Sequence, residues 1–181
     1  MTAPDTHGGT RGPPLPSLPS TPSEFSSCLG ELFVGDQYGT PAHPAGAEGA
    51  GARLLAFRGN VPEVARIEEN MREADEAVRA GDAERYAQLV HEFHDLIVIG
   101  ADNSKLEAHY RTLMNQLAYE RLVRTSLAQP GRLSESDHEH HRVLDLILAK
   151  DGDGAERVMR EHVSRSHQAL MAGMDERQQR S

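Results

Sequence analysis

The 181-residue chain has no tryptophan, few aromatic residues and a single cysteine. Aromatic residues make up only 4% of the chain, which favours a bundle of helices faced by Leu, Val, Ile and Ala over an aromatic-rich β-sandwich. The one cysteine, Cys28, has no second cysteine with which to form an internal disulfide. A reducing compartment is therefore expected.

The chain also lacks an excess of positive charge and any long apolar run. Its formal net charge is −9, and DNA affinity comes largely from Lys and Arg that neutralise phosphates. We therefore expect no direct binding of nucleic acid by this chain. No stretch approaches the ~18 apolar residues of a membrane span, and the N-terminus lacks the features of a signal peptide. A soluble, cytoplasmic protein with no membrane partner is expected.

Proline and glycine are concentrated near the N-terminus. Residues 1–60 hold eight of the ten Pro and ten of the sixteen Gly, and they show no hydrophobic period. Such a segment buries too little apolar surface to offset its chain entropy. We therefore expect residues 1–51 to form a disordered Pro/Gly-rich segment.

From about residue 52 the apolar residues recur with the period of a helix. This period predicts five amphipathic helices, over about residues 62–80, 83–100, 105–127, 136–150 and 154–173. Asp82 is expected to cap the second of these helices, and Ser136 with Glu139 is expected to form a capping box at the fourth. The predicted fold class is all-α, an antiparallel helical bundle over residues 52–174 followed by a tail at 175–181.

Three of the predicted helices each carry one histidine among their apolar residues. These are His94, His140 and His162. Neutral imidazole is the commonest metal ligand in proteins, and the core of a bundle is where such sites are built. Three histidines leave open coordination positions on Zn²⁺ or a similar ion. The alternative is that each is a hydrogen-bonded core residue, which requires three separate buried partners.

The order of these residues resembles a known family. The run His-Glu-Phe-His-Asp-Leu-Ile at 91–97, followed by Asn103 and Leu106, resembles the second-helix signature of FCD, the FadR-type C-terminal domain of GntR-family transcription regulators. Two later segments match the family's spacing, first Glu139-His140 with Val143, Leu144 and Ile147, and then Asp151, Ala155, Met159 and His162. The resemblance covers about residues 52–174, where Ala52 to Arg58 resembles the end of the family's first helix.

This resemblance implies a helical bundle, usually dimeric, that binds a divalent metal through one Asp or Asn and three His. The matching histidines here are His94, His140 and His162. In the family, small organic acids often coordinate the metal and change how attached winged helix-turn-helix domains sit on an operator. We therefore expect a divalent metal (Zn, Ni or Mn), a small organic acid effector and a homodimer.

The chain departs from the family pattern in two ways. Val90 occupies the position of the usual acidic ligand, so water or an effector oxygen would fill that position, or His91 would substitute for it. Residues 1–51 show no helix-turn-helix pattern, and the first helix is cut short before Ala52. We therefore expect no DNA-binding domain in this chain, as in a truncated or rearranged gene.

Two arginines continue the apolar line of the third predicted helix. Arg121 and Arg124 follow Leu113 and Leu117 at helical spacing, so either could bind an effector carboxylate through paired hydrogen bonds. The alternative is that both cations are favoured simply because they lie near the negative end of the helix dipole.

The function expected from these features is that of an effector-sensing domain with no catalytic task. One alternative is a degenerate remnant, or a bundle whose only role is dimerisation. Another is a three-histidine metalloenzyme, which would need a positioned general base. Glu92, Asp95 and Glu139 lie nearby in the sequence, but all three fall outside the apolar stripes.

Overall fold

The computed structural model describes residues 44–116 and 119–179, and within these ranges the chain forms seven helices and no strand. The helices are α2 (Pro44–Arg58), α3 (Pro62–Ala80), α4 (Ala83–Gly100), α5 (Ser104–Gln116), α6 (Tyr119–Leu127), α7 (Arg132–Leu148) and α8 (Gly152–Gln179). The all-α fold class is confirmed. No helix in the described ranges is long and apolar enough to cross a membrane.

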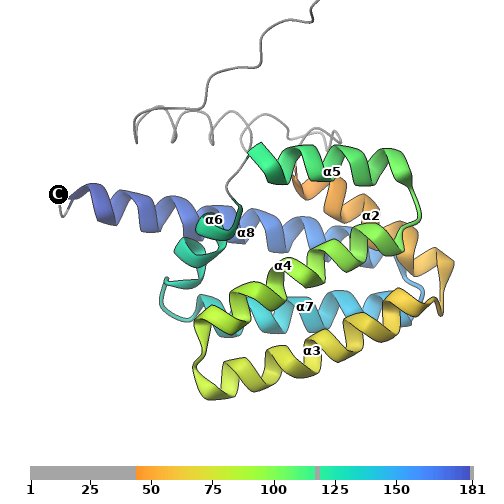
Figure 1. The fold of residues 1–181 in the computed structure, drawn as a ribbon, viewed down its shortest axis with the longest axis horizontal. Coiled ribbons are helices and arrows are strands. Elements are labelled where there is room, and N and C mark those ends of the chain that lie inside the picture. The colour runs from red at the N-terminus through yellow and green to blue at the C-terminus, as the bar shows by residue number, and fades with distance from the viewer. Residues whose placement is uncertain (1–43, 117–118, 180–181) are drawn as a thin grey trace, which may run out of the picture.

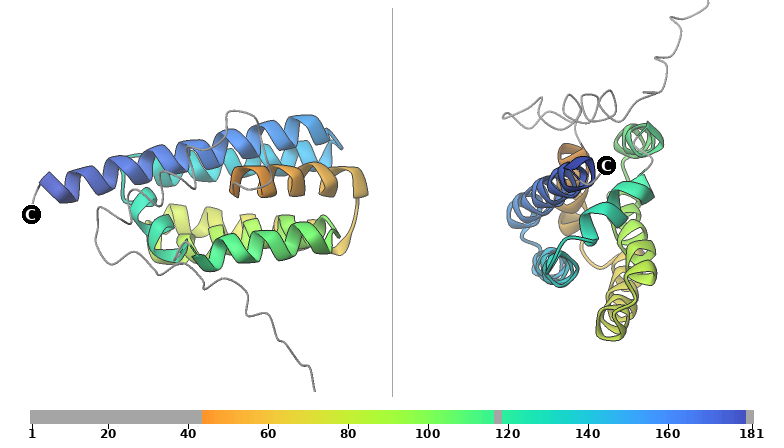
Figure 2. Two further views of the ribbon diagram at one scale, coloured as in Figure 1. Left: turned by 90° about the horizontal axis from the view of Figure 1, so that it is seen from above. Right: turned by 90° about the vertical axis from the view of Figure 1, so that its left-hand side faces the viewer.

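The helices pack in two layers (Figure 1 and Figure 2). Helices α2, α7 and α8 form one layer, α3, α4 and α5 form the other, and α6 lies at one end against α4 and α8. The main core lies between the layers, and most of its large members come from α3, α4, α7 and α8: Ile67, Met71, Phe93, Leu96, Ile97, Val143, Leu144, Ile147, Val158, Met159 and Val163. The antiparallel bundle therefore buries the apolar stripes that the sequence predicts.

The boundary between α3 and α4 follows from local chemistry, as the sequence predicts. Gly81 ends α3 in the left-handed conformation, with φ of 67°, which glycine adopts without the steric cost of a Cβ. Asp82 then caps α4, because its Oδ1 accepts a hydrogen bond from the backbone N–H of Arg85 at 2.9 Å.

The expected disorder of residues 1–51 requires a correction, since α2 begins at Pro44 and residues 44–51 are helical. Ala47, Ala52 and Leu55 are completely buried. A Cβ at Gly51 would already lie 3.4 Å from the side chain of Ile97, so small residues allow α2 to approach its neighbours closely. The alanines and glycines of α2 serve close packing, although a segment of the same composition is also typical of disorder. Residues 1–43 lie outside the described residues.

The single helix expected over 105–127 is two helices, α5 and α6. Tyr110 and Leu113 on α5 share an apolar cluster with Leu122 on α6 and Leu170 on α8. Figure 1 shows α6 running in a different direction from α5, and α6 packs against α8. The helical period of the sequence continues through both helices, which is why it did not predict the break.

The last two helices also differ from their predicted bounds. Helix α7 begins at Arg132, after Gly131 with φ of 78°, so the capping box expected at Ser136 is wrong. Ser136 lies within the helix and is buried. Helix α8 continues to Gln179, past the end of the bundle predicted at residue 174.

Candidate metal centre

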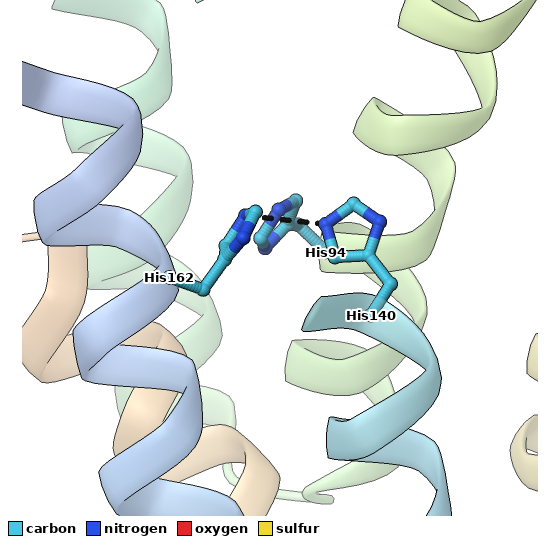
Figure 3. A group of neighbouring side chains, drawn as sticks. All are labelled: His94, His140 and His162. Carbon is cyan, nitrogen blue, oxygen red and sulfur yellow. Dashed lines mark hydrogen bonds between the residues drawn. The ribbon is translucent and has the colours of Figure 1, made fainter. Parts of the chain in front are cut away.

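The fold brings His94, His140 and His162 together in the core, and we call these three residues the histidine triad. They come from α4, α7 and α8, and their side chains point toward one another in Figure 3. The Nε2 atoms of His140 and His162 are 3.1 Å apart, and one ring nitrogen from each of the three lies within 4.8 Å of the others. All three are at most 2% exposed. This separation suits three nitrogens around one ion, since Zn–N bonds are about 2.0–2.1 Å long.

Burial keeps His140 and His162 in the neutral form that binds metals. Burial is the main cause that lowers the pKa of His162 to about 4, with the nearby His94 acting in the same direction and Glu139 opposing both. Burial, together with His162 and His94, also holds the pKa of His140 well below its usual value. Because a protonated imidazole has no lone pair for a metal, these directions favour coordination at neutral pH.

A buried carboxylate supports the triad from behind. Glu139 is 5% exposed, and its Oε2 lies 2.7 Å from Nδ1 of His162. Burial raises the pKa of Glu139, but hydrogen bonds from His162, Arg132 and Arg165 outweigh burial and lower it to about 2. Since the ionised carboxylate only accepts, Nδ1 of His162 carries the proton and Nε2 presents a lone pair to His140. The carboxylate–imidazole pair therefore fixes the tautomer that a metal requires.

Two arginines hold Glu139 in place. Arg132, itself 3% exposed, donates to Glu139 from Nη2 at 2.8 Å and from the same atom to the hydroxyl of Ser166 at 2.8 Å. Arg165 donates to the other carboxylate oxygen, also at 2.8 Å. The sequence pattern places Glu139 outside the apolar stripe and gives no signal for Arg132. Both are in fact buried at the centre.

A second carboxylate approaches the triad from α2. Glu48 is 1% exposed, and its Oε2 lies 3.0 Å from Nδ1 of His94. The two atoms are close but are not aligned as a hydrogen bond, and neither has another partner in the described structure. Glu48 was missed at the level of sequence because its segment was expected to be disordered. The signal was the run of small residues around it, with Ala47 and Ala52 on the buried side of one helix.

A cavity of about 70 Å³ opens beside the triad. This volume exceeds the ~10–15 Å³ that one water centre needs. Its walls include Glu48, His94 and His162, and the other polar lining consists of three serines and one histidine: Ser126, Ser136, Ser166 and His167. The rest of the lining is apolar: Val90, Met114, Leu122, Val123, Leu127, Val163 and Leu170. The cavity is therefore small and mostly apolar, with ring nitrogens that could bind a metal at its wall.

Neither Val90 nor His91 supplies the expected fourth ligand. Val90 is 5% exposed and lines the cavity, so the position that matches the family's acidic ligand is apolar here. His91 lies on the outer side of α4, with its side chain 50% exposed and Nε2 3.9 Å from Asp95. The structure does not bring His91 to the triad.

The two arginines expected near an effector lie on α6. Arg124 forms an ion pair with Glu84 across the surface, and its side chain is 45% exposed. It does not line the cavity. The side chain of Arg121 lies outside the described part of the chain.

A second group of potential ligands lies between α3 and α7. It consists of Asp75, Asp137 and His141, all partly exposed, and we call it the surface cluster. His141 Nε2 lies 2.8 Å from Asp75 Oδ1. Burial raises the pKa of Asp137, while His141 opposes that shift and Asp75 adds to it.

The comparison with known protein families identifies this architecture. The family model described as FCD domain matches residues 48–165. The match begins at Glu48 and includes all three histidines of the triad. No curated protein matches the chain.

Proposed function

The chain belongs to the FCD domain family, the effector-binding domains of GntR-type transcription regulators, and from this premise we propose that it senses a small carboxylate through a metal held by His94, His140 and His162. The proposed ion is divalent, with Zn²⁺, Ni²⁺ or Mn²⁺ as candidates, because imidazole nitrogen suits transition metals. The domain performs no catalysis in this proposal.

One observation carries the proposal more than any other. Two buried and neutral imidazoles face each other through Nε2 atoms 3.1 Å apart, with the third ring beside them. A carboxylate that holds Nδ1–H of His162 leaves its Nε2 without a proton. A group of core histidines with a purely structural role would each have a separate hydrogen-bond partner. Here His140 Nε2–H instead donates to His162 Nε2, and an ion that replaced this proton would meet ring nitrogens from all three histidines.

The cavity supports the effector part of the proposal. Three histidine ligands leave open positions on the ion, and His94 and His162 both line the cavity. A carboxylate oxygen would occupy an open position, while the serine hydroxyls offer hydrogen bonds to the rest of a short organic acid. The cavity volume of about 70 Å³ favours an acid of few carbon atoms.

The position of the triad explains how binding would be transmitted. His94 belongs to one layer of the bundle, on α4, and His140 and His162 belong to the other. An ion bound to all three therefore ties the layers together, and an effector on that ion biases their packing. Such a ligand changes the population of two arrangements by its difference in affinity for them. We also propose a homodimer, as in the family, which light scattering of the purified protein would test.

The metalloenzyme alternative finds little support in the same geometry. Glu139 is the carboxylate that forms a hydrogen bond with the triad, and its pKa is lowered to about 2. A general base works best with a pKa near the working pH. Glu139 therefore orients His162 better than it would remove a proton from a substrate.

The test is a measurement of bound metal and effector on the full chain. We expect close to one equivalent of metal in protein dialysed against Zn²⁺, Ni²⁺ or Mn²⁺, and heat of binding for small di- and tricarboxylates only in the metal-loaded protein. The control is a His94→Ala, His140→Ala, His162→Ala variant. Absence of metal from the folded wild-type protein would refute the proposal and favour a remnant or a bundle used only for association.

A further inference from the structure

Glu48 is an unusual residue in the core of the bundle. It is the acidic residue of α2, it is 1% exposed, and its Oε2 lies 3.0 Å from Nδ1 of His94. Neither atom has another hydrogen-bond partner in the described structure. A buried carboxylate is costly unless it is paired, so this contact requires an explanation.

The molecule contains a second contact of the same kind. Glu139 on α7 accepts the Nδ1–H of His162 at 2.7 Å. Glu48 on α2 faces the Nδ1 of His94 in the same way, only less well aligned. In metal centres a ligating histidine commonly donates its other ring N–H to a carboxylate, which fixes the tautomer and the direction of the ring.

Glu48 contacts His94 but does not lie among the atoms that could bind the ion. The nitrogens that lie within 4.8 Å of one another come from the three histidines, and no Glu48 oxygen belongs to that group. One ion at bonding distance from all of them would therefore be out of reach of Glu48 in this arrangement, since metal–oxygen bonds are about 2.0–2.2 Å long.

We propose that Glu48 is a positioning residue of the metal centre, which accepts the Nδ1–H of His94 and thereby couples α2 to metal occupancy. The inference rests on the proposed function of the triad. Donation of Nδ1–H to Oε2 leaves Nε2 of His94 free of a proton, so metal binding and this contact favour the same tautomer. The carboxylate that the family pattern leads one to expect at position 90 is thus provided from another helix, in a different role.

The contact also links the two layers of the fold. Glu48 is on α2, in the layer with α7 and α8, whereas His94 is on α4 in the other layer (Figure 2). Helix α2 is the first helix of the described chain. Through Glu48, metal binding at the triad stabilises this helix. Amide hydrogen exchange in α2 therefore slows when metal binds, and this slowing depends on Glu48.

The first test uses NMR on the metal-free full chain labelled with ¹⁵N-histidine. Long-range ¹H–¹⁵N spectra at neutral pH report which ring nitrogen of His94 carries the proton. We expect Nδ1–H in the wild-type protein, and a shift toward Nε2–H in Glu48→Met, which keeps an unbranched side chain but has no carboxylate. Glu48→Gln retains an acceptor oxygen and is expected to keep part of the Nδ1–H population. An Nε2–H tautomer in the wild-type protein would overturn the proposal.

The second test is a Co²⁺ titration followed by visible absorption and by hydrogen exchange. We expect the dissociation constant to rise about 10- to 100-fold in Glu48→Met, and less in Glu48→Gln, with the positions of the Co²⁺ bands unchanged. The matched control is Glu156→Gln, which alters a carboxylate between Arg53 of α2 and Arg160 of α8, away from the triad. If Glu48→Met does not fold, Glu48→Gln and the wild-type NMR spectrum still decide the question.

The outcomes separate this inference from the proposed function. Wild-type affinity in both Glu48 variants would overturn the positioning role while leaving the metal site intact. Shifted Co²⁺ bands would show that Glu48 is itself a ligand and would also overturn it. Failure of the wild-type protein to bind Co²⁺ at all would refute the metal function and the coupling to α2, and the tautomer of His94 would then decide the carboxylate contact alone.

Discussion

Two groups of side chains in the described part of the chain bring three potential ligands within reach of one ion, and they differ in burial. The histidine triad is in the core, and each member is at most 2% exposed. The surface cluster lies between α3 and α7, and its members are partly exposed. His141 and Asp75 in the surface cluster already form an ion pair, with side chains 39% and 42% exposed.

The two groups have similar ligand spacing but different surroundings. In the triad, burial lowers the pKa of His140 and His162 and a bound carboxylate fixes the ring of His162. In the surface cluster, water competes for each group and the histidine is satisfied by its neighbour. An ion would replace one hydrogen bond in each group, His140–His162 in the triad and His141–Asp75 in the cluster, but only the triad is shielded from water. Variants in the two groups test this contrast.

The largest effect is expected from the removal of a triad histidine. His162→Ala deletes one of three ligands, so the affinity for Zn²⁺ should fall by more than about 100-fold, since even the loss of a residue behind a ligand costs 10- to 100-fold. Zinc-dependent stabilisation, about 2.7 kcal/mol at a concentration 100 times the dissociation constant, should disappear at the same concentration. Isothermal titration and thermal melting measure both.

The matched controls for this variant are His141→Ala in the surface cluster and His91→Ala on the outer side of α4. Both should keep the wild-type zinc affinity. If His141→Ala lost zinc and His162→Ala did not, the assignment of the two groups would be reversed.

The next effect is expected from Glu139→Gln. An uncharged amide leaves Arg132 buried without its carboxylate, so the free energy of unfolding of the metal-free protein should fall by about 3 kcal/mol. Zinc affinity should also fall about 10- to 100-fold, because the orientation of His162 is weakened. Urea unfolding measures the change in stability, and zinc titration measures the change in affinity. A variant with unchanged stability and affinity would mean that the carboxylate is incidental to the centre.

Acid should destabilise the metal-free protein through the triad. The folded-state pKa of His162 is lowered to about 4, while in the unfolded chain it is near 6.5. The unfolded state therefore binds more protons between these values, and stability is greatest above about pH 6.5 and falls as the pH drops toward 4. From pH 7 to pH 5 His162 alone should cost about 2 kcal/mol of stability in urea unfolding, and the lowered pKa of His140 adds to this loss.

The pH slope has a clear control. His141→Ala should keep the loss of stability, because it leaves the buried His140 and His162 unchanged. Stability that stays constant or rises between pH 7 and pH 5 would show that folding does not lower the pKa values of His140 and His162.

The smallest effect, with the opposite sign, is expected at Asp137. Burial raises the pKa of Asp137 above its unfolded value, so the stability this group contributes is present below the unfolded pKa and is lost as the pH rises through the folded pKa. At neutral pH, Asp137→Asn should remove that cost and raise the melting temperature by about 1–3 °C. A lower melting temperature would indicate that the electrostatic attraction of His141 outweighs the burial of Asp137.

Much of the fold and the centre of the site were predictable from the sequence. The helical period identified α3 and α4 closely, because their apolar stripes are flanked by polar faces and their boundary has a glycine and a capping aspartate. The same period placed His94, His140 and His162 in the core. A histidine on an apolar stripe faces the same partners as the residues three and four positions away.

The supporting carboxylates were not predictable in the same way. Helix α2 is rich in Ala and Gly, so it has no strong contrast between an apolar and a polar face, and Glu48 was missed with it. Glu139 lies one residue before His140, outside the apolar stripe of α7, yet both residues contact His162 of α8. A one-dimensional period cannot reveal which polar residue beside a stripe meets a buried arginine.

The most direct test of the histidine centre is X-ray absorption at the zinc edge on the full chain loaded with one equivalent of Zn²⁺. We expect three imidazole nitrogens at about 2.0–2.1 Å, with the remaining coordination from oxygen. This signature should be lost in His162→Ala and kept in His141→Ala. A spectrum with one imidazole and mainly oxygen ligands would place the zinc in the surface cluster and not in the histidine triad.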